Sequence, residues 1–155
     1  MISVQGLTHR YDRTVVLDEV GLTIPVGRLT SIIGPNGAGK STLLSVVSRL
    51  LRPARGQVVV GGLDVATAAD DVIARTLAVL RQDNRIAARL SVVDLVRFGR
   101  FPYSKGRLRQ EDHDKVEEAI AYLELEEYRD RYLDQLSGGQ RQRAYIAMVL
   151  AQDTD

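Results

Sequence analysis

Apolar and polar positions alternate differently in the early and late parts of the chain. Over residues 2–11 and 15–24, apolar side chains recur with the two-residue period of strands. A continuous apolar run at 29–33 stops at Gly34, which predicts a buried strand that ends in a loop. From Lys40 onward, apolar side chains recur at helical spacing. This part of the chain therefore predicts strands, a glycine loop and a helix in succession.

The later pattern becomes helical. Further strands are predicted at 57–60 and 77–80, and Thr67 with Asp70 has the spacing of a capping box before a short helix. Beyond residue 90, helices are predicted after Ser91, over 111–123 and after Ser137. No repeat or low-complexity tract interrupts these elements, and the fold class is mixed α/β.

The composition narrows the possible functions. The 155 residues are 45% hydrophobic and 26% charged with a net charge of +1, as in an ordinary soluble domain. Such a balance gives no bulk attraction to nucleic acid or anionic membrane, so a charged ligand must be held locally. Cysteine is absent, which excludes disulfides and thiolate chemistry. Because no leader-like start or long apolar run is present, we expect a cytoplasmic protein that reaches a membrane only through a partner.

A glycine-rich segment connects the apolar run at 29–33 to the helix that follows. It fits the pattern G-x-x-x-x-G-K-[ST] with the residues Gly34, Pro35, Asn36, Gly37, Ala38, Gly39, Lys40, Ser41 and Thr42. Glycines let backbone amides wrap round phosphate groups, and the helix adds its positive N-terminal end. A glycine turn that binds nothing is the alternative, but the flanking strand and helix favour a nucleotide site.

Three side chains of this loop have expected roles. Lys40 reaches the β- and γ-phosphates of ATP, Ser41 ligates Mg²⁺ through its hydroxyl, and Thr42 bonds to the α-phosphate. The loop alone leaves kinases, GTPases and helicases open.

A second motif lies at the start of the last predicted helix. It consists of Leu136, Ser137, Gly138, Gly139 and Gln140, followed by basic residues. Ser137 has the position of a helix N-cap and Gln140 that of its capping-box partner, while the glycines keep the helix end open to an anion. Taken alone, an ordinary capped surface helix explains this pattern, but its occurrence after a phosphate loop favours a functional reading.

The two motifs together resemble the ATP-binding subunits of ABC transporters, from the first strand to the last residue. The resemblance implies an ABC-type P-loop NTPase core with N-terminal antiparallel strands, a parallel core sheet and a helical signature subdomain. The expected divisions are a nucleotide-binding core at 1–90, a helical subdomain at 91–136, and the signature helix and chain end at 137–155. It also implies a head-to-tail homodimer or a paired ABC subunit, in which residues 136–140 face the γ-phosphate of the partner's ATP.

The same resemblance assigns further residues and partners. Tyr11 matches the aromatic residue that stacks on adenine, although a tyrosine packed at a strand end is the alternative. Gln82 matches the glutamine that contacts Mg²⁺ and the attacking water, with Arg81 in place of a frequent proline. Transmembrane permease subunits and, indirectly, a substrate-binding protein are the implied partners, which places the subunit on the inner face of the membrane.

The groups expected to activate water are missing from these 155 residues. In the resembled family, an apolar strand with Asp and a catalytic Glu follows the signature helix, and a switch histidine comes later. Asp18 and Glu19 imitate that acidic pair but precede the phosphate loop, so we interpret them as surface turn residues, and neither His9 nor His113 matches the switch. We therefore expect a domain that is incomplete at its C-terminus, of low stability, which binds ATP and hydrolyses it poorly.

The segment 92–103 indicates the kind of transporter. It is similar to the stretch V-x-x-x-V-x-x-G-R-x-P of importers for iron-siderophore complexes, haem and cobalamin, and ferric siderophore is the favoured substrate. Gly99 and Pro102 should expose basic and aromatic side chains for docking against a permease. Basic and aromatic residues at 97–110 also suit nucleic acid, but the net charge offers no wider positive field. A repair-type ABC ATPase and a non-hydrolysing regulator remain the alternative functions.

Overall fold

The computed structural model describes residues 1–81 and 88–154. Within it the chain forms two compact units, Met1–Leu77 and Ala78–Asp155, and each is described by itself. In the described residues, no helix combines the length and the apolar composition that a membrane crossing needs.

The first unit is built on a four-stranded sheet in the order β2-β1-β3-β4, in which all neighbours are antiparallel. Its strands are β1 (Ile2–Tyr11), β2 (Thr14–Ile24), β3 (Arg55–Val60) and β4 (Leu63–Asp64). Ile2 lies opposite Ile24 on one side and Val60 on the other. The strands predicted at 2–11, 15–24 and 57–60 are thereby confirmed.

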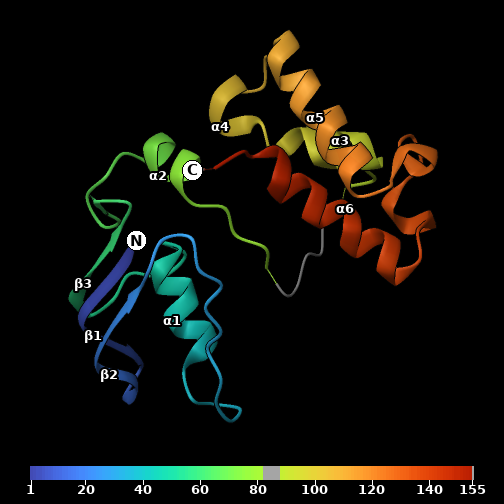
Figure 1. Ribbon diagram of the computed structural model, residues 1–155. Coiled ribbons are helices and arrows are strands. Elements are labelled where there is room, and N and C mark those ends of the chain that lie inside the picture. The colour runs from blue at the N-terminus through green and yellow to red at the C-terminus, as the bar shows by residue number, and fades with distance from the viewer. Residues whose placement is uncertain (82–87, 155) are drawn as a thin grey trace. The chain divides into compact units, whose positions relative to one another are not determined.

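Helix α1 (Lys40–Val47) packs its apolar face against this sheet (Figure 1). Val46 and Val47 of the helix are buried in one cluster with Val4, Leu7 and Val58 of the strands. The burial of such aliphatic side chains is the main force that holds a helix to a sheet. The helix that begins at the glycine loop is therefore held in place by its contacts with the sheet.

Helix α2 (Asp70–Thr76) is present, but its predicted cap is wrong. Its N-cap is Ala69, and no side chain caps the helix. Thr67 instead belongs to a preceding turn, in which the Thr67 and Ala68 amides donate to the Asp64 carbonyl. Because α2 begins at Asp70, Thr67 lies two residues before the N-cap position, and its spacing to Asp70 does not form a capping box.

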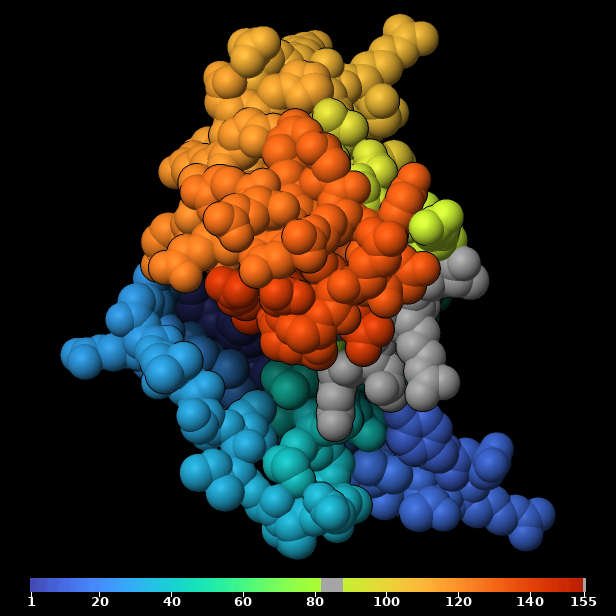
Figure 2. Space-filling model, turned by 90° about the vertical axis from the view of Figure 1, so that its right-hand side faces the viewer, coloured from blue at the N-terminus to red at the C-terminus, as the bar shows by residue number. Residues whose placement is uncertain are grey.

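Two predicted core strands do not form in the described residues. Residues 29–33 and 77–80 have no strand structure, and Leu29 and Ile33 are 99% and 92% exposed. Figure 2 shows this part of the first unit in light blue, at the surface. A parallel strand needs hydrogen-bonding neighbours, and no described segment supplies them here. The expected parallel component of the sheet is therefore absent from the described residues.

The second unit is helical. Its α-helices are α3 (Val92–Phe98), α4 (Phe101–Ser104), α5 (Gln110–Tyr122) and α6 (Gly138–Ala151), and its 3₁₀ helices are η1 (Glu126–Tyr128) and η2 (Leu133–Gln135). The predicted helical run, including the helix at 111–123, is confirmed. Helices α3, α5 and α6 share one buried cluster that includes Leu95, Ile120 and Ala147 (Figure 1). At Gly99 the backbones approach so closely that a Cβ atom there would lie 2.1 Å from the Met148 carbonyl oxygen.

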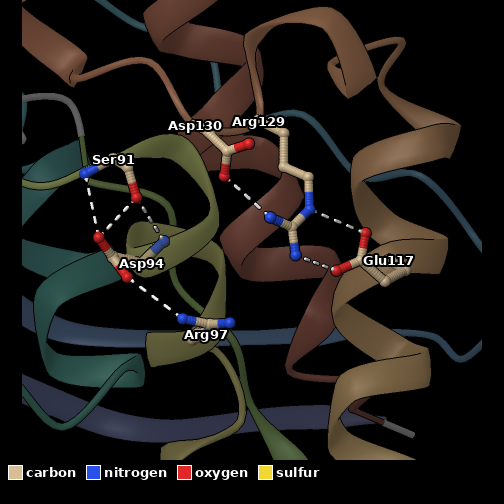
Figure 3. Close-up of polar contacts among 6 residues, drawn as sticks. All are labelled: Ser91, Asp94, Arg97, Glu117, Arg129 and Asp130. Atoms are coloured by element: carbon tan, nitrogen blue, oxygen red, sulfur yellow. Dashed lines mark hydrogen bonds and ion pairs between the residues drawn. The ribbon is translucent and has the colours of Figure 1, made fainter.

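Polar contacts fix the ends of these helices (Figure 3). Ser91 caps α3 as predicted: its hydroxyl accepts from the Asp94 amide at 3.2 Å and donates to the Asp94 carboxylate. That hydrogen bond from Ser91 holds the pKa of Asp94 below its ordinary value. Arg129 donates to Glu117 of α5 through two nitrogens, at 2.8 and 3.3 Å, and to Asp130 at 2.9 Å. The loop after α5 is thereby tied back to that helix.

Candidate functional site

The phosphate loop runs into α1 through Gly39, which is the N-cap of the helix with φ +83°. A Cβ atom at this position would lie 2.9 Å from Leu17 Cδ2 and 2.9 Å from the Val16 carbonyl oxygen. The conformation and the close approach to β2 thus both require glycine. Gly37 also has φ +83°, but open space surrounds it. No side chain caps α1, so its first amides are left for other acceptors.

Lys40 folds back over the loop. Its Nζ donates to the carbonyl oxygens of Gly34 at 2.8 Å and Pro35 at 2.7 Å. The ammonium group thereby lies at the loop, beside the start of α1. A full positive charge and the helix N-terminus converge on one place, which suits an anion with several negative oxygens.

The neighbouring hydroxyls have different surroundings. Ser41 is exposed, so its hydroxyl is accessible from solvent. Thr42 is buried in the first turn of α1. The accessibility of Ser41 is compatible with metal ligation, and the roles of both residues remain predictions.

Tyr11 ends β1, directly before the turn into β2, and is 48% exposed. Its ring meets the ring of His9 edge-to-face, with a centroid distance of 4.9 Å and an interplanar angle of 81°. The exposed part of the ring is available for stacking. Gln82, the other residue predicted from the resemblance, lies outside the described residues.

The second motif has the predicted local geometry. The Ser137 hydroxyl accepts from the Gln140 amide at 3.3 Å, and the Gln140 side-chain oxygen accepts from the Ser137 amide at 2.9 Å. Leu136 is buried in the helical unit, whereas Ser137, Gly138 and Gly139 are exposed. A Cβ atom at either glycine would meet nothing within 4 Å. The start of the 14-residue helix α6 is therefore capped and accessible.

The remaining titratable candidates take other places. Asp18 and Glu19 are exposed as predicted, but they belong to β2 rather than to a turn, and the Glu19 amide donates to the Thr8 hydroxyl at 3.1 Å. In the parts of the chain at 1–81 and 88–154, no three histidine or acidic side chains gather as metal ligands. His113 lies in α5 of the helical unit.

An apolar groove of about 390 Å³ lies beside α3 and α4. Leu90, Phe98, Phe101 and Leu108 line it, with Asp94 and Arg97 among its polar residues. Phe98 and Phe101 are more than half exposed, as the sequence predicted for this segment. Large apolar side chains exposed around one depression are typical of a protein-binding surface.

Arg100 corrects the expectation that Gly99 and Pro102 expose the basic side chains. The side chains of Arg100 and Asp112 are only 4% and 6% exposed and form an ion pair at 2.9 Å. Arg100 also donates to the Ala151 carbonyl oxygen at 3.0 Å. Burial alone raises the pKa of Asp112, but hydrogen bonds from the Arg109 amide and Arg100 outweigh it, and the pKa lies below its ordinary value. In the sequence, the one signal for this ion pair is the acidic residue Asp112 in the first turn of α5.

The glycine loop with Lys40 at the start of α1 defines a phosphate-binding protein of the P-loop class. The capped, glycine-containing start of α6 is the second of the two motifs. Comparison with known proteins identifies the family within this class. Residues 17–155 match the profile of the family described as ABC transporter, so the chain belongs to that family. The resemblance drawn from the two motifs is confirmed.

Two relatives illustrate the match. The petrobactin import ATP-binding protein YclP of Bacillus subtilis is 50% identical over 155 residues, which are 100% of this chain and 62% of that protein. The ferric enterobactin transport ATP-binding protein FepC of Escherichia coli is 43% identical over 152 residues, 97% of this chain and 56% of that protein. This chain thus spans less than two thirds of the length of these relatives.

Solved structures confirm the fold class. A bacterial ABC transporter cassette with a dimeric structure superimposes with a TM-score of 0.83 at 31% identity, over 99% of this chain and 71% of that one. The same cassette, in a post-hydrolysis state bound to ADP and Pi, gives a TM-score of 0.84 at 30% identity, over 99% and 71% of the two chains.

Proposed function

We propose that this protein is the ATP-binding subunit of an ABC importer for ferric siderophores. The observation that carries the proposal is the Lys40 ammonium held against the Gly34 and Pro35 carbonyls, in a loop whose Gly39 tolerates no side chain. The relatives named for petrobactin and ferric enterobactin support the siderophore class. No relative reported above favours a repair ATPase or a regulator.

ATP is bound by residues 34–42, with Tyr11 stacked on its adenine. Lys40 exchanges its two carbonyl acceptors for the β- and γ-phosphates, because a charged acceptor makes the stronger hydrogen bond. Thr42 bonds to the α-phosphate. Ser41, supported by its exposure, and Gln82 would hold the Mg²⁺, which would supply positive charge to the phosphates.

Two subunits complete each other's sites. The capped, exposed start of α6, from Leu136 to Gln140, approaches the γ-phosphate held by a second copy or a paired ABC subunit. Its geometry supports this, since the Ser137 and Gln140 side chains fix the turn while the glycines leave an open approach. The dimeric form of the related cassette supports pairing of two such subunits.

The apolar groove beside α3 and α4 binds a permease subunit. Phe98 and Phe101 supply exposed anchors of the kind that an amphipathic helix contacts in a groove. Docking there places this subunit on the inner face of the membrane, and a substrate-binding protein acts on the complex indirectly. Nucleic acid is not a partner in this proposal.

The 155 residues by themselves bind ATP and turn it over slowly. Hydrolysis needs groups that position water and stabilise the developing charge, and no Asp-Glu pair follows Gln140 in the sequence. Coupling of hydrolysis to transport is therefore assigned to the assembled importer.

The test of the proposal is ATP binding by the Lys40→Ala variant, measured by titration with a fluorescent ATP analogue. We expect affinity to fall at least a hundredfold, because the phosphates lose their one point charge from the loop. Lys115→Ala is the matched control, since Lys115 is a lysine of the helical unit that forms ion pairs with Glu118 and Asp153. Equal affinities of the Lys40 variant and the unchanged protein would overturn the assignment.

A further inference from the structure

His9 is a buried titratable residue that the proposed nucleotide site does not use. Its exposed fraction is 9%, and it lies on β1 where the register with β2 shifts on either side of it. In the described part of the chain, neither Nδ1 nor Nε2 of its ring has a hydrogen-bond partner. Such an arrangement is unusual, because buried polar atoms are nearly always paired.

The specific contact that His9 makes is with Tyr11. The two rings meet edge-to-face at 4.9 Å and 81°, which is a favoured geometry for aromatic pairs. Because the ring nitrogens are unpaired, the imidazole acts here through its shape and its ring contact rather than as a donor or acceptor. Its effect is therefore exerted on the orientation of Tyr11.

Tyr11 needs such support. It is the last residue of β1, and Asp12 beside it adopts φ +52° in the turn to β2. A half-exposed ring at a strand end can occupy several rotamers, and each unproductive rotamer lowers the fraction that can stack on a base. A buried neighbour that contacts the ring restricts this choice.

His9 also connects the ring to the phosphate loop. Its cross-strand partner on β2 is Leu17. Gly39 packs closely against the Leu17 side chain, since a Cβ atom on Gly39 would lie 2.9 Å from Leu17 Cδ2. One cross-strand pair thus joins the strand end that carries Tyr11 to the last turn of the phosphate loop.

We propose that His9 is a positioning residue of the nucleotide site, which holds the Tyr11 ring in the orientation that stacks on a purine base. This inference rests on the proposed function, because it presumes that ATP binds to residues 34–42 and Tyr11. It assigns to His9 a share of the affinity for the base and none for the phosphates.

The test compares ATP with inorganic triphosphate, which lacks the base, by titration calorimetry on this chain. For His9→Ala we expect ATP affinity to fall about threefold to tenfold, the range of one aromatic pair, with triphosphate affinity unchanged. His9→Phe should retain ATP affinity within about twofold, since it keeps the ring and removes the unpaired nitrogens. In a Tyr11→Ala background, His9→Ala should have no further effect on ATP.

Several results would overturn the proposal. Unchanged ATP affinity in His9→Ala would show that Tyr11 needs no support, and an equal loss for ATP and triphosphate would indicate a purely structural role. A loss in His9→Phe as large as in His9→Ala would show that a ring nitrogen acts directly. Thermal melting of each variant identifies misfolding. If the unchanged protein binds neither ligand, or Lys40→Ala binds both normally, the proposed function fails irrespective of His9.

Discussion

The two helix starts that carry the proposed nucleotide-contacting residues, at α1 and α6, are built in opposite ways. Helix α1 begins at Gly39 with no side-chain cap, and its lysine bonds to the loop's own carbonyls. Helix α6 begins at Ser137, where a reciprocal capping box satisfies two amides. A start that wraps an anion must keep its amides free, whereas a start that is presented to a second molecule must hold its shape alone. The first depends on backbone conformation and the second on side chains.

The largest effect is expected at the far end of α6, where Arg100 pairs with Asp112 and bonds to the Ala151 carbonyl. Arg100→Ala should lower the free energy of unfolding of the helical unit by about 3–5 kcal/mol, because it leaves a buried carboxylate unpaired. Arg143→Ala removes an exposed ion pair with Glu124 at 3.7 Å and a hydrogen bond to the Leu123 carbonyl oxygen at 3.1 Å, and should cost about 1–2 kcal/mol. Denaturant unfolding followed by circular dichroism measures both, and equal costs would contradict this account.

At the start of α1, Gly39→Ala should abolish most ATP binding and destabilise the first unit by about 1–3 kcal/mol. It combines backbone strain with a clash against Leu17 and Val16. Gly37→Ala is the matched control, because it has the same φ with open space around it, and its cost should be near about 1 kcal/mol. If the two variants lose stability and affinity equally, the close approach is irrelevant.

At the start of α6, Ser137→Ala should cost about 1 kcal/mol of stability through loss of the cap. It should leave ATP binding to the single chain unchanged, which separates this helix start from that of α1. Ser137→Asp keeps a good cap and should restore the stability while adding a negative charge to the surface. Thermal melting and nucleotide titration distinguish the two contributions, and a loss of ATP affinity in Ser137→Ala would contradict the separation.

The smallest expected effect is on the stability of the protein at acidic pH. Because the pKa of Asp112 in the folded protein lies below its value of 3.8 in the unfolded chain, ionised Asp112 stabilises the fold above that pH. This contribution is lost as pH falls below 3.8 through the lower folded-state pKa. Asp112→Asn should therefore flatten the loss of stability between pH 4 and pH 2, about the range in which carboxylates titrate. An unchanged slope in acid denaturation would count against this role.

How much the sequence predicts depends on how local the cause is. The caps at Ser91 and Ser137 were predictable because each uses a partner three residues away. The structure of residues 29–33 was not predictable in this way, because an apolar segment forms a strand only if another segment pairs with that strand. The burial of the charged Arg100 side chain was also not predictable from nearby residues, because it depends on Asp112 and Ala151, which lie 12 and 51 residues away.

Of the candidate site, the sequence predicted the loop and the signature by residue. It did not predict that Lys40 bonds to the carbonyls of its own loop, because this depends on how the backbone turns at Gly34 and Pro35. Nor did it indicate the buried ring of His9 beside Tyr11, which depends on how the two side chains pack at the end of β1.

The close contact at Gly99 has a mechanical consequence. With Met148 against the end of α3, and with no room for even one methyl group, these two helices cannot slide past each other. The groove residue Phe98 is the last residue of α3, and Ser137 caps the first turn of α6. A displacement of the groove residues at the end of α3 should therefore be passed on to α6 within this unit, because the close packing leaves little room to absorb it. We therefore expect α3 and α6 to move together.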